Sequence, residues 1–274
     1  MNRPLRMTAS LLGLLLFCAL AGLVLVAGLE DRFIYFPQKA LEATPNAYGL
    51  EAETLWLDTG GARLHGWWIR GSGRRVLLFF HGNAGNIGHR LERAGLFARE
   101  LHLDVLLVDY RGYGESSGKP SEAGLYADGG AIYRCAADRG FRPSQIVLFG
   151  ESLGSAVALE TALRHPCAAV ILETPFLSIP AMAKTIYPFL PGFVIRTRFD
   201  NESKIALLSI PKLIIAAESD EIVPREHALR LFELARPHKQ LYVVPGATHN
   251  DTYIVGGQQY LDTLKSFLKT PASP

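Results

Sequence analysis

A serine flanked by glycines is the residue whose setting most clearly suggests chemistry. Residues 150–154 read Gly-Glu-Ser-Leu-Gly, directly after an apolar run and before a Ser-Ala-Val-Ala stretch. The pattern Gly-x-Ser-x-Gly between a strand and a helix is typical of a nucleophile on a sharp turn, where larger neighbours would collide with the backbone. Such a turn exposes the Ser152 hydroxyl and directs the N–H of Leu153 at a developing oxyanion. The motif predicts nucleophilic catalysis at Ser152; a Gly-rich packing turn is the alternative.

A serine nucleophile needs a base and an acid, and in this kind of site the chain order is Ser, acid, His. His249 lies in the loop 245–251, beyond the last predicted strand, whereas the other histidines after Ser152 fall in or beside predicted helices. Asp220 follows the predicted strand 212–217 and would orient the imidazole. Glu218 and Glu221 are the alternatives for the acid, although we expect them to face solvent, and Asp251, which follows the histidine, is expected to order its loop.

A second oxyanion donor is expected in the loop 81–86, His-Gly-Asn-Ala-Gly-Asn, which follows the predicted strand 75–80. Small residues let backbone N–H groups approach an anion, so we assign the donor to Asn83, with Ala84 as the alternative. The loop lacks the lysine of a phosphate-binding P-loop. His81 and His89 have no third ligand at a suitable spacing, so the sequence predicts no metal and no cofactor.

Alternating strands and helices must position these residues. Short runs rich in Val, Ile, Leu and Phe alternate with amphipathic stretches, which predicts an α/β fold with a mostly parallel central sheet and helices on both faces. The expected strands are 53–58, 63–70, 75–80, 104–109, 145–149, 169–173, 212–217 and 240–244, the first two forming a hairpin. The expected helices are 88–101, 121–138, 152–164, 225–235 and 257–268.

Two segments of the body carry more specific expectations. The helix 88–101 has an apolar face, and we place its charged residues, Arg93 among them, toward solvent. Residues 175–207 interrupt the strand–helix rhythm with prolines and large apolar side chains. We interpret this segment as a small lid inserted in the single domain 31–274, the alternative being an insertion that only packs on the surface.

The first thirty residues form a separate unit. Residues 8–29 are an unbroken run of 22 positions in which only Thr8 and Ser10 are polar, after Arg3 and Arg6. About 20 such residues span a bilayer core of ~30 Å as a helix. We therefore expect residues 1–30 to be a single-pass membrane anchor, with the body on the non-cytoplasmic side because the basic end stays inside. A cleaved signal peptide and a buried core helix are the alternatives.

Composition excludes several classes of protein. Hydrophobic residues make up 49% and charged residues 20% of the 274 positions, which excludes a disordered or collagen-like chain. Beyond Arg3 and Arg6 the basic and acidic residues balance, so no electrostatic footprint for nucleic acid is present. Cys135 and Cys167 are expected as separate buried thiols, the alternative being a disulfide if the body lies outside the cytoplasm.

Several strings resemble one known family. HGNAGNIGHRL at 81–91, DYRGYGESSGKPSEAGLYAD at 109–128, GESLGSAVA at 150–158, FLSIPAMA at 176–183 and GATHNDTY at 246–253 are similar to the Bem46-like branch of the α/β-hydrolase superfamily. The resemblance spans roughly residues 33–268. It implies an α/β-hydrolase fold, the same three residues as a catalytic triad, and a membrane anchor like those of relatives.

These observations together predict a serine hydrolase that cleaves a carboxylic ester or thioester through an acyl-enzyme on Ser152. The apolar lid and the anchor favour a small-molecule or lipid-like acyl substrate. A serine peptidase of the aminopeptidase kind shares this chain order, and a non-catalytic, membrane-tethered binding protein is the alternative outside enzymes. The sequence does not indicate an oligomeric state.

Overall fold

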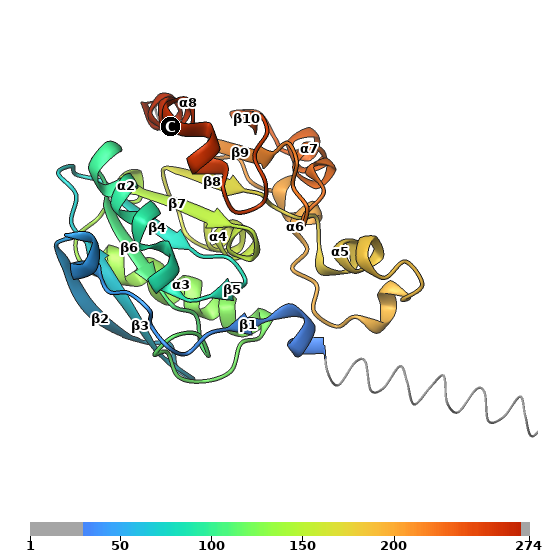
Figure 1. Cartoon of the computed structure of the whole chain (residues 1–274), viewed down its shortest axis with the longest axis horizontal. Coiled ribbons are helices and arrows are strands. Elements are labelled where there is room, and N and C mark those ends of the chain that lie inside the picture. The colour runs from blue at the N-terminus through green and yellow to red at the C-terminus, as the bar shows by residue number, and fades with distance from the viewer. Residues whose placement is uncertain (1–29, 270–274) are drawn as a thin grey trace, which may run out of the picture.

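Eight strands form a single mixed sheet at the centre of the molecule, in the spatial order β10-β9-β8-β7-β4-β6-β3-β2 (Figure 1). The structure, a computed structural model, describes residues 30–269. The strands are β2 (Ala52–Asp58), β3 (Arg63–Ile69), β4 (Val76–Phe80), β6 (Asp104–Val108), β7 (Ile146–Glu151), β8 (Ala169–Glu173), β9 (Lys212–Ala217) and β10 (Lys239–Val244). The β2–β3 and β3–β6 pairs are antiparallel and all other pairs are parallel. The predicted strands are confirmed and differ from expectation only at their ends.

Helices cover both faces of the sheet, as predicted. They are α2 (Leu91–Glu100), α3 (Glu122–Asp138), α4 (Leu153–Arg164), α5 (Ile179–Ile186), α6 (Asn201–Ile205), α7 (Arg225–Leu234) and α8 (Thr252–Lys269). Alternate side chains of each strand point to opposite faces. In β4, for example, Leu78 packs with residues of α3, α4 and α7, whereas Phe79 packs with α2 and α8. The sheet therefore separates two apolar cores.

Short elements complete the chain. Four 3-10 turns are present in the described region: η1 (Pro45–Tyr48), η2 (Ile87–Arg90), η3 (Pro143–Gln145) and η4 (Gly192–Val194). A parallel pair of two-residue strands, β1 (Phe36–Pro37) and β5 (Ala84–Gly85), was not predicted. This pair attaches the N-terminal end of the described chain to the loop after β4, where a site residue is expected. Residues 52–69 form the predicted hairpin, closed by the Thr59 N–H donating to the Ala62 carbonyl.

The predicted lid segment, residues 175–207, connects β8 to β9 and contains α5, η4 and α6. Its α5–η4 portion projects from the body close to residues 30–34, which are helical (Figure 1). The expected anchor lies outside the described residues except for Glu30. Within residues 30–269, no helix combines the length and the apolar character needed to cross a membrane.

The two cysteines of the body are free thiols, Cys135 half-buried and Cys167 buried. Burial raises the pKa of the Cys167 thiol to about 12, so this side chain behaves as a small apolar residue of the core. The interpretation as separate thiols is confirmed.

Candidate active site

Ser152 occupies a strained turn between β7 and α4. Its backbone has φ 51° and ψ −115°, a conformation that non-glycine residues adopt only where the surrounding structure enforces it. The flanking glycines explain how the turn is accommodated. A Cβ on Gly150 would lie 2.3 Å from the Gly154 carbonyl oxygen, and one on Gly154 would lie 2.0 Å from the carbonyl oxygen of Phe80. The Gly-x-Ser-x-Gly pattern is thus a packing requirement of the turn that presents the Ser152 side chain.

His249 and Asp220 meet Ser152 from the loops that follow β10 and β9. His249 Nε2 lies 3.0 Å from Ser152 Oγ, and Nδ1 lies 2.9 and 2.8 Å from the two carboxylate oxygens of Asp220. The His249 and Asp220 side chains are almost fully buried, 6% and 2% exposed. Parallel strands bring their carboxyl ends to one edge of the sheet, which is why residues far apart in sequence converge here.

Asp220 is fixed by backbone donors. Its Oδ1 accepts hydrogen bonds from the N–H groups of Ile222 (3.0 Å) and Val223 (2.7 Å). These bonds orient the carboxylate toward the imidazole, where it can accept a hydrogen bond from the Nδ1–H of His249. The structure thus brings together the three residues predicted from chain order.

The other nearby carboxylates have a different arrangement. Glu218 and Glu221 are exposed, as expected, yet each accepts a backbone hydrogen bond from the histidine loop: Gly246 N–H to Glu218 at 2.8 Å and His249 N–H to Glu221 at 3.0 Å. Asp251 accepts from the Thr248 N–H at 2.7 Å and so orders its own loop. All three position the loop that carries the histidine, without contacting the imidazole.

The expected oxyanion donors lie beside the serine. Asn83 and Leu153 line the same cavity as Ser152. Neither backbone N–H has a hydrogen-bond partner elsewhere in residues 30–269. Leu153 is the first residue of α4, where helix geometry leaves N–H groups unpaired and the helix dipole favours an anion.

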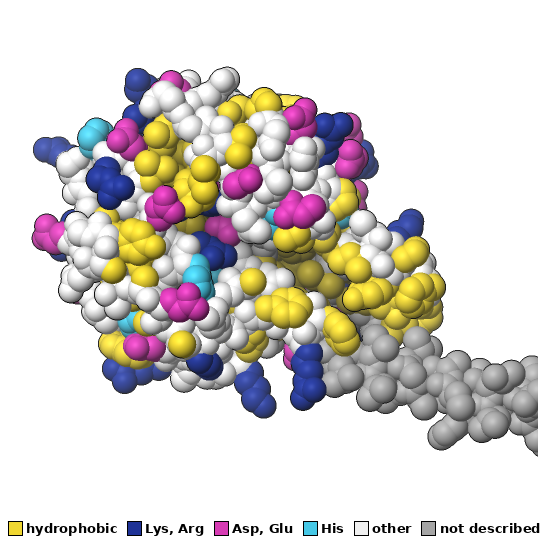
Figure 2. Space-filling view, in the orientation of Figure 1, with side chains coloured by type: hydrophobic (Ala, Val, Ile, Leu, Met, Phe, Trp, Pro, Cys, Tyr) yellow, Lys and Arg dark blue, Asp and Glu magenta, His cyan; other side chains and the backbone are white. Residues whose placement is uncertain are grey.

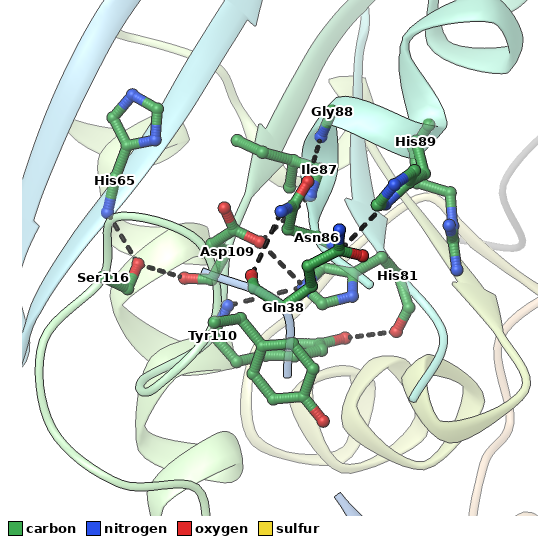
Figure 3. Close-up of polar contacts among 12 residues, drawn as sticks. Gln38, His65, His81, Asn86, Ile87, Gly88, His89, Asp109, Tyr110 and Ser116 are labelled. Carbon is green, nitrogen blue, oxygen red and sulfur yellow. Dashed lines mark hydrogen bonds and ion pairs between the residues drawn. The ribbon is translucent and has the colours of Figure 1, made fainter. Parts of the chain in front are cut away.

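His81 holds the loop 81–86, in which the second oxyanion donor is expected. The sequence had suggested His81 only as a candidate metal ligand. Its Nδ1 lies 2.8 Å from the Gly82 carbonyl oxygen, and its Nε2 lies 3.5 Å from the backbone nitrogen of Tyr110 (Figure 3). A carbonyl can only accept, so Nδ1 carries the proton and Nε2 is the acceptor. Complete burial lowers the pKa of His81 to about 3, which keeps it neutral.

The consequence is an oriented peptide plane. The Gly82 carbonyl and the Asn83 N–H belong to one trans peptide and point in opposite directions. Holding the carbonyl with the His81 ring therefore fixes the direction of the proposed donor. The Tyr113 hydroxyl donates to the next carbonyl, that of Asn83, at 2.8 Å. In the sequence, the only indication of this role is that a histidine begins the loop in which the donor is expected.

Beneath the serine turn lies a buried ion cluster, and here one expectation was wrong. Arg93, expected to face solvent, is 4% exposed. Its Nη1 lies 2.5 Å from Glu173 and 3.3 Å from Glu151, while Arg90 lies 3.2 Å from Glu151. Burial opposes ionisation of Glu151, but the two arginines outweigh it and lower its pKa. Arg93 of α2 faces inward because β7 and β8 both end in a buried glutamate.

An apolar cavity opens beside Ser152. Its volume is about 580 Å³, within the range of small-molecule sites. Apart from Ser152, Asn83, Glu30 and the Tyr187 hydroxyl, its lining side chains are hydrocarbon or thioether. One wall comes from the segment 175–207 and another from residues 30–36, so the predicted lid and the N-terminal end of the described chain both line the cavity.

Comparison with known proteins identifies the family. The family described as alpha/beta hydrolase fold matches residues 75–204. Protein bem46 of Schizosaccharomyces pombe is 35% identical over 260 residues, covering 87% of this chain and 86% of bem46. Alpha/beta hydrolase domain-containing protein WAV2 of Arabidopsis thaliana is 34% identical over 281 residues, covering 91% and 90%.

Solved structures support the same fold. An esterase of Pyrococcus furiosus superposes with a TM-score of 0.71 at 20% identity, over 87% of this chain and 98% of the esterase. At that identity the likeness concerns the fold alone. Together with the two relatives and the geometry around Ser152, it leads to one assignment. The chain belongs to the Bem46-like branch of the α/β-hydrolase superfamily.

Proposed function

We propose that this hydrolase cleaves a carboxylic ester or thioester through an acyl-enzyme on Ser152. The observation that carries the proposal is the hydrogen-bonded series Ser152 Oγ, His249 and Asp220, with separations of 3.0 and 2.8 Å. The imidazole is within the distance at which a base accepts a hydroxyl proton, and the carboxylate on its other nitrogen selects the tautomer that can do so.

The reaction has two steps. In the first, Ser152 Oγ attacks the acyl carbon as His249 Nε2 takes the hydroxyl proton, and the Asn83 and Leu153 N–H groups stabilise the oxyanion. The bond to the leaving oxygen or sulfur then breaks, and His249 returns the proton to that atom. In the second step His249 takes a proton from water, and the water oxygen attacks the acyl carbon. The bond to Ser152 Oγ then breaks, His249 returns the proton to Oγ, and the carboxylic acid leaves.

The surroundings of the serine favour an acyl substrate. The cavity of about 580 Å³ presents almost only apolar side chains, so it would bury a hydrocarbon chain and desolvate a charged group without compensation. The apolar residues 8–29 fit a single-pass anchor that keeps the body at the non-cytoplasmic face of a membrane. Both features point to a lipid-like substrate.

Labelling with a fluorophosphonate, which reacts with activated serines, tests the proposal. Full-length protein in membranes should be labelled, and Ser152→Ala should abolish labelling. Ser144→Ala is the matched control because Ser144 is exposed at the opposite end of β7. Asp220→Asn should retain the fold and lower kcat for p-nitrophenyl butyrate by about 10⁴-fold, since the imidazole then takes the wrong tautomer. Labelling that persists in Ser152→Ala would contradict the assignment, and hydrolysis of aminoacyl amides but not of esters would favour the peptidase.

A further inference from the structure

Exposed aromatic and aliphatic side chains gather around the mouth of the cavity. On the segment 175–207, Phe189 and Phe193 are 82% and 83% exposed, and opposite them Phe33 is 61% exposed. The other members of this surface, which we call the mouth patch, are Phe36, Ile186 and Tyr187. Figure 2 shows apolar side chains concentrated on this lobe, in contrast to the mixed surface of the sheet domain. Contiguous apolar patches of this kind mark interaction sites.

In residues 175–199, the part of the lid segment that carries the mouth patch, every charged side chain is basic. Residues 175–199 contain no Asp or Glu and include Lys184, Arg196 and Arg198. Lys184 and Arg198 are exposed. Aromatic side chains flanked by basic ones are the composition of surfaces that lie in the interfacial layer of a bilayer, where rings reach the acyl boundary and cations meet phosphates.

The two sides of the mouth are tied to each other. The Glu30 carboxylate accepts hydrogen bonds from the backbone N–H groups of Arg196 at 3.1 Å and Thr197 at 2.7 Å. The Glu122 carboxylate accepts from Arg198 and Phe199 at 2.7 and 2.8 Å. The lid segment is therefore bound to Glu30, the residue that directly follows the 22-residue apolar run. A bilayer holding that run would meet the mouth patch directly.

We propose that the mouth patch lies in the surface of the bilayer and that a long acyl chain passes from the lipid into the cavity beside Ser152 without crossing water. The occupant of the patch is thus the bilayer itself, and the substrate class is an ester or thioester of a long-chain fatty acid resident in the membrane. The second part rests on the proposed function; the docking of the patch does not.

Fluorescence quenching tests docking without reference to activity. Full-length Phe193→Trp is reconstituted in dioleoylphosphatidylcholine vesicles with or without brominated acyl chains, and the emission of the wild-type tryptophans is subtracted. The added emission should be quenched by bromine. Ile254→Trp is the matched control, since Ile254 is also exposed (61%) but lies on α8, and it should not be quenched. The proposal would be overturned if bromine did not quench the added emission of Phe193→Trp. This holds also for emission that is blue-shifted, since a protein partner or residues 8–29 would then cover the side chain.

Activity tests the second part. Phe193 does not line the cavity, so Phe193→Ser should leave turnover of water-soluble p-nitrophenyl acetate within about twofold. It should lower turnover of p-nitrophenyl palmitate in vesicles by about tenfold, the equivalent of burying one phenyl group. Equal effects on the two esters would overturn the acyl-chain route. Bromine quenching of Phe193→Trp in a protein that the fluorophosphonate does not label would retain docking and reject the proposed function.

Discussion

At the scale of single residues, the proposed base His249 and the positioning residue His81 differ in their surroundings. His249 reaches Ser152 from a loop, with a carboxylate 2.8 Å behind it. His81 is enclosed among Tyr110, Tyr113 and Asp109, and burial lowers its pKa to about 3. A base must be able to gain a proton during the reaction, whereas a positioning group is best kept neutral.

Substitution of His81 separates positioning from folding. We expect His81→Leu to lower kcat for p-nitrophenyl butyrate by about 10- to 100-fold with little change in KM, because the Gly82–Asn83 peptide loses its holder while substrate contacts remain. His81→Asn, whose amide can replace the Nδ1–H donor, should restore most of kcat. Steady-state kinetics and Tm of the three proteins measure this. A fall in Tm with unchanged kcat in His81→Leu would show that the residue is only structural.

At the scale of elements, the parts of the fold with a clear period could be predicted and those that depend on distant neighbours could not. The buried strands could be assigned because each is a short run rich in Val, Ile, Leu or Phe between polar turns. The pair β1–β5 could not, because two residues carry no period. Arg93 was misplaced because the pattern of α2 shows which face is apolar but not that Glu151 and Glu173 are buried under it.

The same limits apply to the candidate site. Ser152, Asp220 and His249 could be found because strand ends and chain order fix where a nucleophile, an acid and a base lie. The role of His81 depends on a ring–carbonyl distance that no spacing reveals. The link between Glu30 and the lid segment joins residues more than 160 positions apart in the chain, and sequence periodicity holds no information on such a contact.

The ion cluster at the end of β7 and β8 yields a prediction about stability. Glu173 also accepts hydrogen bonds from Thr252 (2.8 Å) and Tyr260 (2.5 Å), so the cluster joins α2 and α8 to the sheet. Arg93→Met leaves the buried Glu173 carboxylate without its cation and should lower the free energy of unfolding by about 3–5 kcal/mol. Arg99→Met, at an exposed position of the same helix, is the control and should change it by less than about 0.5 kcal/mol. Urea unfolding of full-length protein in detergent micelles measures both; equal effects would contradict the role of the cluster.

At the scale of the whole molecule, buried ionisable groups link the site to the pH dependence of folding. Asp109 follows β6, and its Oδ1 lies 3.6 Å from His81 Nε2 and accepts the Ile87 N–H at 3.0 Å (Figure 3). Burial raises the pKa of Asp109 to about 8. Four histidines have lowered pKa values, and their effect on stability fades within about one pH unit above ~6.5, their unfolded value. Burial lowers the pKa of Lys212 to about 8. These histidines and Lys212 make stability rise with pH, whereas Asp109 makes it fall.

The sign follows from proton binding. Between pH 6.5 and 8 the folded protein keeps the Asp109 proton, whereas the unfolded chain, with an Asp pKa near ~4, has lost it. At this carboxyl the folded state then binds more protons, so the contribution of Asp109 to the free energy of unfolding falls as pH rises and levels off above the folded pKa. Over this window its contribution should fall by about 1–2 kcal/mol. Asp109→Asn keeps the size of the side chain and removes the proton, so its slope should be more positive than that of the wild type by this amount. Asp138→Asn, at an exposed position of α3, should retain the wild-type slope. Urea unfolding in micelles at pH 6.5, 7.2 and 8 measures the three slopes, and a slope in Asp109→Asn equal to that of the wild type would show that this carboxyl is ionised in the folded protein throughout the window.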